Sequence, residues 1–183
     1  MTTVFVGGSR HVSRLPAQAT ERLNNLIRSG HHVIVGDAHG VDKAVQRHLS
    51  DAGYRNVTVF CSGERSRNNL RRWCTHAVTS NASGFQFYAA KDRAMARETD
   101  FGFMIWDSKS VGTVLNVLRL VRAGKIVALI NVPDKTTLNF KSPAQWEGFL
   151  AKLHPSLVAD LRSRATSDEW MPQARAADLP GCL

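Results

Sequence analysis

The sequence predicts an α/β protein with a Rossmann-like, three-layer fold and a mainly parallel sheet of about five or more strands. Short apolar segments rich in Val, Ile and Phe recur along the chain with little alternation, as strands buried on both faces do. Helical patterns lie between most of these segments, which implies parallel strands joined by right-handed crossovers. Polar loops that contain glycine follow the strands, where open α/β sheets bind their ligands.

Five segments have the composition of buried strands, namely residues 3–6, 32–35, 57–60, 101–106 and 126–130. Amphipathic patterns predict helices over residues 16–29, 41–52, 86–98 and 110–123. Pro16 suits the first turn of the first helix, and Ser110 suits the N-cap of the fourth. Gly30 and Gly124 follow the first and fourth helices, in the position of helix-ending glycines.

The chain of 183 residues suits one domain with a core of its own. We expect a ligand-binding core over residues 1–131 and a helical extension with a tail over residues 132–183 of the same domain. Within the extension, residues 143–153 and 155–164 have the composition of short helices, and residues 166–183 resemble a loosely packed tail. Residues 61–84 are compatible with a short helix, an irregular loop or a small hairpin.

The charge balance favours anionic partners. Lys and Arg number 24 against 15 Asp and Glu, which gives a net charge of +9. This balance does not choose between nucleotides, nucleic acid and acidic surfaces. No apolar run approaches the roughly 18 residues of a membrane helix, and no secretory leader begins the chain, so we expect a cytoplasmic protein without a membrane partner. The odd number of cysteines, three, without CxxC spacing predicts reduced thiols.

Four polar loops would converge at one edge of the predicted sheet, because the carboxyl ends of parallel strands lie together. Their candidate ligand-binding residues are Gly7, Gly8, Ser9 and Arg10 after the first strand; Gly36, Asp37, Gly40 and Asp42 after the second; Arg67 and Asn68 after the third; and Asp107, Ser108, Lys109, Ser110, Gly112 and Thr113 after the fourth. One glycine loop would be a weak signal, whereas four such loops, each directly after a predicted strand, favour a binding site.

The first loop combines close approach with positive charge. Gly7 and Gly8 lack a Cβ, so a ligand can come near their backbone. Arg10 can then clamp a phosphate or carboxylate with its planar guanidinium. The alternative is an ordinary tight turn that carries a surface arginine.

The fourth loop leads into a helix N-terminus over residues 108–113. Unpaired N–H groups and the helix dipole favour an anion there, and the hydroxyls of Ser110 and Thr113 can add donors. The alternative is an ordinary serine N-cap beside a solvated Lys109. In the second loop, Asp37 and Asp42 either accept hydrogen bonds from ribose hydroxyls or, for Asp42, complement the dipole of the next helix.

A basic cluster follows the third strand. Arg65, Arg67, Arg71 and Arg72 lie close in sequence to Trp73. Such a cluster can bind phosphates or stack on single-stranded bases, and it can equally be a solvated basic loop.

Several reaction classes lack their motifs. The histidines have no zinc-site spacing, and His48 lies on an apolar helical stripe, as a hydrogen-bonded core histidine does. The GxSxG nucleophile elbow and the GxxxxGK[ST] phosphate loop are both absent. We therefore predict no metal and no cofactor.

Three segments together resemble the SLOG superfamily, which includes the Lonely Guy phosphoribohydrolases and the DNA-processing protein A family. They are GGSR, GDAHGVDKAV and KDRAMARETDFGFMIWDSKSVGT, and the resemblance spans about residues 3–131. It implies a Rossmann-like sheet that binds nucleotides or nucleotide-derived ligands, in a homo-oligomer of two or more chains. GDAHGVD looks like the glycine-rich turn of the DNA-processing members.

SVGT looks like the end of the Lonely Guy motif GGxGTxxE, which holds a nucleotide phosphate. This resemblance carries the phosphate contact over to Gly112 and Thr113, while Ser110 replaces a glycine. The glutamate of the motif falls on Asn116, whose amide cannot take a proton or stabilise a ribosyl cation by charge. An arginine of the family falls on Lys91, and the neighbouring Asp92 can supply a carboxylate instead.

These residues lead to one main prediction and two alternatives. We expect a protein that binds a nucleotide or nucleotide-derived ligand as a sensor or carrier, with Lys91, Asp92 and Asn116 beside the four loops. The first alternative is an N-glycosidic hydrolase or transferase acting on nucleoside monophosphates, with Asp92 and Lys91 as its catalytic residues. The second is single-stranded nucleic-acid binding by residues 65–73.

Overall fold

A seven-stranded sheet forms the centre of the computed structural model, which describes residues 2–170. The strand order is β4-β3-β2-β1-β5-β6-β7, and β7 alone runs antiparallel to its neighbour. The strands are β1 (Thr3–Gly8), β2 (His32–Gly36), β3 (Val57–Ser62), β4 (Cys74–Val78), β5 (Phe101–Trp106), β6 (Ile126–Asn131) and β7 (Thr136–Phe140). The predicted Rossmann-like α/β fold is confirmed.

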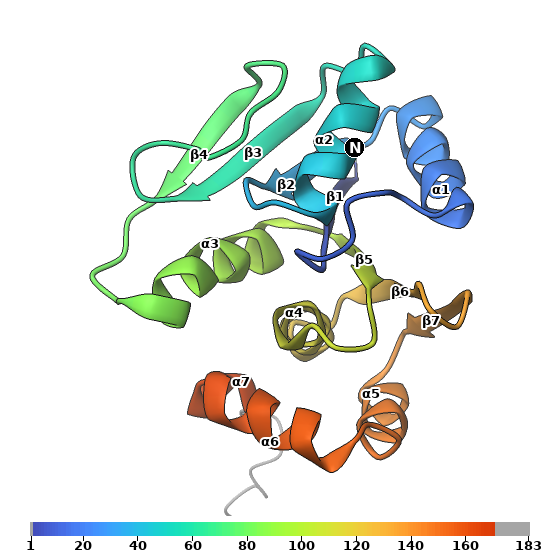
Figure 1. The fold of residues 1–183 in the computed structure, drawn as a ribbon, viewed down its shortest axis with the longest axis vertical. Helices are drawn as coiled ribbons and strands as arrows, with labels where there is room; N and C mark the ends of the chain where they lie inside the picture. The colour runs from blue at the N-terminus through green and yellow to red at the C-terminus, as the bar shows by residue number, and fades with distance from the viewer. Residues whose placement is uncertain (1, 171–183) are drawn as a thin grey trace, which may run out of the picture.

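Helices cover both faces of the sheet (Figure 1). They are α1 (Ala17–Arg28), α2 (Val41–Asp51), α3 (Gly84–Glu98), α4 (Val111–Arg122), α5 (Pro143–Leu150), α6 (Pro155–Arg164) and α7 (Ser167–Trp170). On β1, Val4 and Val6 pack in the core shared with α1 and α2, whereas Phe5 packs in the core shared with α3 and α4. This alternation creates three layers, since successive side chains of a strand point to opposite faces.

All five predicted strands belong to the sheet, but the sequence pattern does not reveal its two edges. Residues 63–73 form an irregular loop, one of the expected alternatives, whereas β4 is a parallel strand that none of those alternatives included. Four of its five residues are exposed, so it has no apolar run to mark it. The antiparallel β7 lies beyond residue 131, where we expected only helices and a tail.

The predicted helices are confirmed with small shifts in their ends. The helix α3 starts at Gly84 rather than at Gln86, and α5 ends at Leu150. The short helix α7 occupies the first part of the predicted tail. The rest of that tail, residues 171–183 with Cys182, lies outside the described residues. Across residues 2–170, no helix combines the length and apolar character that crossing a membrane requires.

The chain changes direction across the sheet between β1 and β5. It builds β1 to β4 on one side and then β5 to β7 on the other, which makes the β1–β5 edge a topological switch point. Two hydrogen bonds join the loops there: Ser9 Oγ donates to Asp107 Oδ2 over 2.7 Å, and the Ser9 N–H donates to the Ile105 carbonyl over 3.0 Å. Gly8 allows this approach, because a Cβ would collide with the same carbonyl.

Candidate functional site

A pocket of about 580 Å³ opens at the switch point. The loop after β1, the helix α3 and the N-terminus of α4 form its walls, and α6 contributes to its rim. The predicted binding residues that line it are Gly7, Gly8, Arg10, Asp42, Lys91, Asp92, Lys109, Ser110, Gly112, Thr113 and Asn116. Three of the four predicted loops therefore meet the same cavity, and so does the helix that bears Lys91.

The other predicted residues do not line this pocket. They are Ser9, Gly36, Asp37, Gly40, Arg67, Asn68, Asp107 and Ser108. Gly40 has a φ of 74° and lies against the backbone of Arg10, so it lets the first two loops touch. A side chain at residue 40 would require a strained backbone and would collide with the backbone of Arg10.

A buried ion cluster forms one wall of the pocket. Lys91 is 4% exposed, and its Nζ lies 2.7 Å from Asp92 Oδ1. Gly36 gives the cluster room, because a Cβ there would collide with the Asp42 carboxylate and lie 2.8 Å from the Lys91 Nζ. Burial alone would lower the pKa of Lys91, but attraction to Asp92, Asp42 and Asp37 raises it overall, so the side chain stays charged.

Asp42 is the carboxylate most affected by this burial. Its side chain accepts a hydrogen bond from the Ala38 N–H over 3.1 Å and is 6% exposed as a residue. Burial raises the pKa of Asp42 to about 6, and the positive charge of Lys91 offsets this effect only in part. Asp42 therefore changes charge close to neutral pH, at the wall of the pocket.

Arg67, a predicted phosphate-binding residue, pairs with Asp37. The guanidinium donates from Nε over 3.0 Å and from Nη2 over 2.6 Å to the two oxygens of that carboxylate. Burial opposes ionisation of Asp37, but the hydrogen bonds from Arg67 prevail and lower the pKa of the carboxyl. Asn68 holds the same loop by donating from Nδ2 to the Asp37 carbonyl over 2.8 Å. These three residues fix the second and third loops against each other.

Asp107 caps the start of α4 in place of the predicted Ser110 side chain. Its Oδ1 accepts hydrogen bonds from the N–H groups of Lys109 and Ser110, over 3.1 and 2.7 Å. Burial would raise the pKa of Asp107, but the Ser9 hydroxyl and these N–H groups lower it. Ser110 occupies the N-cap position, yet its hydroxyl accepts from the Thr113 hydroxyl rather than from the backbone. The prediction was right for the position and wrong for the capping group.

The next turn of α4 faces open space. The first N–H groups of a helix have no partner within it, and those of Val111, Gly112 and Thr113 follow the two that Asp107 binds. A Cβ at Gly112 would meet no atom within 4 Å, so the pocket is open beside this turn. Ser108 faces the other way, with a φ of 64° and a hydroxyl that donates to Asn131 Oδ1 over 2.6 Å.

Asn116 presents an oriented amide to the pocket. The residue is 6% exposed, and its Oδ1 accepts from Arg119 Nη1 over 2.6 Å. Since the oxygen is occupied, the NH2 group is the part of this side chain left for a ligand. Arg119 in turn donates from Nε to Glu169 Oε1 of α7 over 2.6 Å, and Arg93 donates to the same oxygen over 2.7 Å.

Sequence reasoning missed this second group of residues. Arg119 is a single charge inside the apolar stretch VLNVLRLV, which was a usable signal that it has a buried partner. Tyr88 was also missed as a site residue. The guanidinium carbons of Arg10 and Arg67 lie 5.4 and 4.9 Å from its ring centroid, and the ring lines the pocket.

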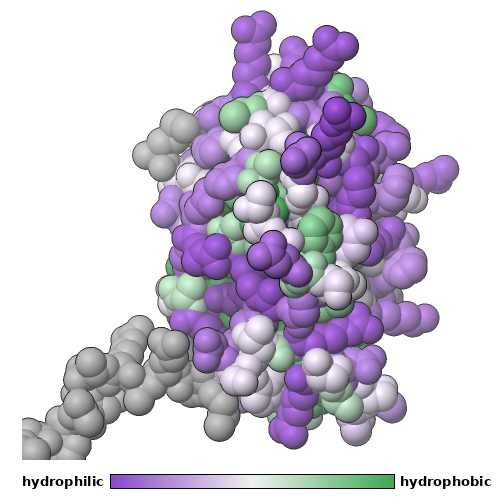
Figure 2. Space-filling view, turned by 90° about the vertical axis from the view of Figure 1, so that its left-hand side faces the viewer, coloured by the Kyte–Doolittle hydropathy of each residue, from purple (hydrophilic) through white to green (hydrophobic). Residues whose placement is uncertain are grey.

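The basic cluster after β3 does not offer an aromatic stacking surface. Trp73 is 8% exposed, packs in the core, and donates from Nε1 to the Tyr54 carbonyl over 3.0 Å. Hydrophilic residues dominate the face drawn in Figure 2, and hydrophobic ones form small separate patches there. The basic cluster therefore keeps the positive charge that the nucleic-acid prediction requires, but Trp73 is not exposed for stacking on bases.

Within residues 2–170, no group of three or more His, Cys, Asp or Glu side chains is placed to hold a metal ion. Cys61 and Cys74 are free thiols. No protein-family model, no curated protein and no solved structure matches this chain. The resemblance to the SLOG superfamily consequently stays a prediction from the motifs, and the geometry of the pocket is the basis for a function.

Proposed function

We propose that this protein binds a nucleotide or a nucleotide-derived anion in the switch-point pocket, as a sensor or carrier. The strongest support is the convergence of three kinds of donor on one cavity: the first turn of α4, the amide of Asn116, and the cations Lys91 and Arg10. A helix start favours anions through its free N–H groups and its dipole. The NH2 group of the buried Asn116 side chain is a separate donor, which would bind an acceptor atom of the ligand.

The lining divides by chemistry in a way that suits the parts of a nucleotide. The phosphate would rest on residues 111–113, with the Ser110 and Thr113 hydroxyls and Lys109 beside it. The base would lie against Tyr88 and Phe85, which line the same cavity. The Asp92 carboxylate would accept hydrogen bonds from ribose hydroxyls, since it lines the same cavity.

Calorimetry and thermal unfolding of the full chain with AMP, ADP and adenosine test this function. At 100 times its dissociation constant, a bound nucleotide stabilises the fold by about 2.7 kcal/mol. We expect adenosine to bind at least tenfold more weakly than AMP, because it lacks the phosphate. Equal shifts for AMP and adenosine, or none for any of the three, would contradict a phosphate seat at α4.

A glycine pair makes the test specific to the seat. Gly112→Asp puts a carboxylate beside the proposed phosphate, and the open space around Gly112 accommodates it. Gly148→Asp is the matched control, because that glycine lies in α5 with the same open surroundings and lines no pocket described above. AMP affinity should fall at least tenfold in the first variant and stay unchanged in the second.

One observation favours hydrolysis as a second candidate function. Asp42 and Asp92 line the same cavity, and the pKa of Asp42, raised to about 6, suits proton transfer near neutral pH. In such a reaction water would add to the anomeric carbon of a nucleoside monophosphate, the C–N bond would break, and the base would leave with a proton. Release of free base that disappears in Asp92→Asn would establish this reaction and overturn the binding-only function.

A further inference from the structure

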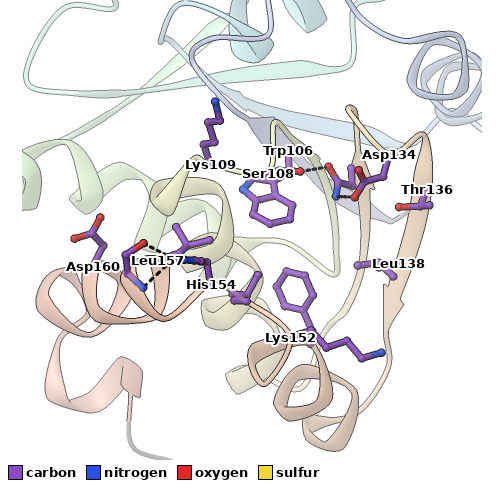
Figure 3. A pocket seen from close by; sticks show the side chains of 14 residues that line it. Trp106, Ser108, Lys109, Asp134, Thr136, Leu138, Lys152, His154, Leu157 and Asp160 are labelled. Carbon is purple, nitrogen blue, oxygen red and sulfur yellow. Dashed lines mark hydrogen bonds between the residues drawn. The ribbon is translucent and has the colours of Figure 1, made fainter.

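A second hollow of about 620 Å³ lies next to the switch-point pocket (Figure 3). It is bounded by the ends of β5 and β6, by β7, and by the segment that joins α5 to α6. Lys109 and Asp160 line both cavities, so the two share a boundary at the start of α4. Each cavity alone is within the size range of small-molecule sites.

The two cavities lie on opposite sides of the switch point. The first meets the loops after β1 and β2, whereas the second lies beyond β5 and β6. The N-terminus of α4 stands between them. Open α/β sheets bind ligands of two halves in this arrangement, with the linking phosphates at a helix start and one half on each side of the switch.

The second hollow has an apolar floor and a polar edge. Leu138 is 37% exposed, and Phe149 and Leu157 line the hollow with it. Three polar residues at its edge are joined by hydrogen bonds: Ser108 donates to Asn131, which donates from Nδ2 to Asp134 Oδ2 over 2.7 Å (Figure 3). Lys152 and Asp160 add exposed charges to the same lining. Such a surface suits the face of a ring better than a second charged group.

Two exposed charged residues of opposite sign, Lys109 and Asp160, line the shared boundary. Among the described residues, Lys109 has no ion-pair partner, and its side chain is exposed where the two cavities meet. In Figure 3 it stands at the edge of the second hollow and not on its floor. A pyrophosphate at the α4 start would therefore have Lys109 beside it, where the two cavities meet.

We propose that the two cavities form one composite site for a ligand whose two ring-bearing halves are joined through a pyrophosphate. One half occupies the switch-point pocket, the pyrophosphate rests on the α4 start beside Lys109, and the second ring covers Leu138 and Leu157. This inference rests on the proposed function, because the phosphate seat is common to both. It adds the size of the ligand and the surface that recognises its second half.

The test compares ADP with diadenosine diphosphate by calorimetry on the full chain. These probes share one nucleoside and a pyrophosphate, and only the second carries another ring. We expect diadenosine diphosphate to bind at least tenfold more tightly than ADP. Leu138→Glu should reduce this ratio to about one, since it places a carboxylate on the floor of the second hollow.

Ile126→Glu is the matched control, because Ile126 is also an exposed strand residue, at the amino end of β6 and outside both cavities. It should leave the ratio unchanged while it changes the net charge equally. A ratio near one in the unmodified chain, or the same ratio in both variants, would overturn the composite site and leave the proposed function standing. If none of AMP, ADP and diadenosine diphosphate binds, the proposed function fails and the composite site fails with it.

Discussion

Arg119 holds Asn116 through a hydrogen bond of 2.6 Å from Nη1 to Oδ1, and both residues are buried. The bond engages the amide oxygen of Asn116, and the residue lines the pocket, so its NH2 group is the donor left for a ligand. Glu169 supports Arg119 from α7, so a residue near the end of the described chain helps to orient a group in the binding site. The pocket depends in this way on the C-terminal extension as well as on the sheet.

Asn116→Asp should weaken ADP binding at least tenfold. The new carboxylate can still accept from Arg119, so the fold should persist, but the pocket loses its NH2 donor and gains a negative charge. Calorimetry with ADP measures the effect. Asn139→Asp is the control, since Asn139 is exposed on β7 and lines neither cavity. Equal ADP affinity in both variants would show that Asn116 does not contact the ligand.

Glu169→Gln should destabilise the fold by about 3 kcal/mol at pH 7, because it leaves Arg93 and the buried Arg119 without their counter-charge. The hydrogen bonds of Arg93 and the charge of Arg119 outweigh burial and lower the pKa of Glu169 to about 2. A carboxyl with a depressed pKa stabilises the fold above its unfolded pKa and loses this effect as pH falls toward the folded value. The difference between the two chains should therefore shrink below about pH 4.5.

Urea unfolding from pH 7 down to the lowest pH at which the fold persists measures this difference. Asp168→Asn is the control, since Asp168 is the exposed acidic neighbour in α7. It should change the free energy of unfolding by no more than about 0.5 kcal/mol. A Glu169→Gln effect as small as that of the control would mean that the two arginines are solvated without it.

The sheet shows why part of the fold was predictable. Strands β1, β2, β3, β5 and β6 have helices on both faces, and their burial leaves mostly apolar runs in the sequence. The edge strands β4 and β7 are mostly exposed and read CTHAV and TTLNF, without such a run. Their pairing depends on a neighbouring strand rather than on their own composition, so the sequence pattern misses them.

The site was predictable to a similar extent. The loops after β1, β2 and β5 converge because the carboxyl ends of parallel strands share one edge, which follows from topology alone. The partner of each charged side chain does not follow from topology. Arg67 turns to Asp37, 30 residues earlier, and Arg119 turns to Glu169, 50 residues later. These pairs decide which arginine is free for a ligand, and only the three-dimensional arrangement reveals them.

Asp42→Asn should remove a pH dependence of stability between about pH 4 and pH 6. Burial raises the pKa of Asp42 from 3.8 to about 6, so the folded chain binds a proton in this range that the unfolded chain releases. The free energy of unfolding therefore falls as pH rises through this window and levels off above it. Urea unfolding at half-unit pH steps should show that the free energy of unfolding falls less steeply with rising pH in Asp42→Asn than in the unmodified chain. An unchanged slope would mean that the pKa of Asp42 in the folded chain lies near its ordinary value of 3.8.

Gly36→Ala should destabilise the fold by about 2 kcal/mol, because the added methyl group enters the space between the Asp42 carboxylate and the Lys91 ammonium. Both side chains are buried on the pocket wall, so neither can move into solvent to relieve the contact. Gly148→Ala, in an open part of α5, should instead stabilise the chain by up to about 1 kcal/mol through helix propensity. Urea unfolding of the two variants measures both effects. If Gly36→Ala is as stable as the unmodified chain, the buried ions are farther apart than the structure places them.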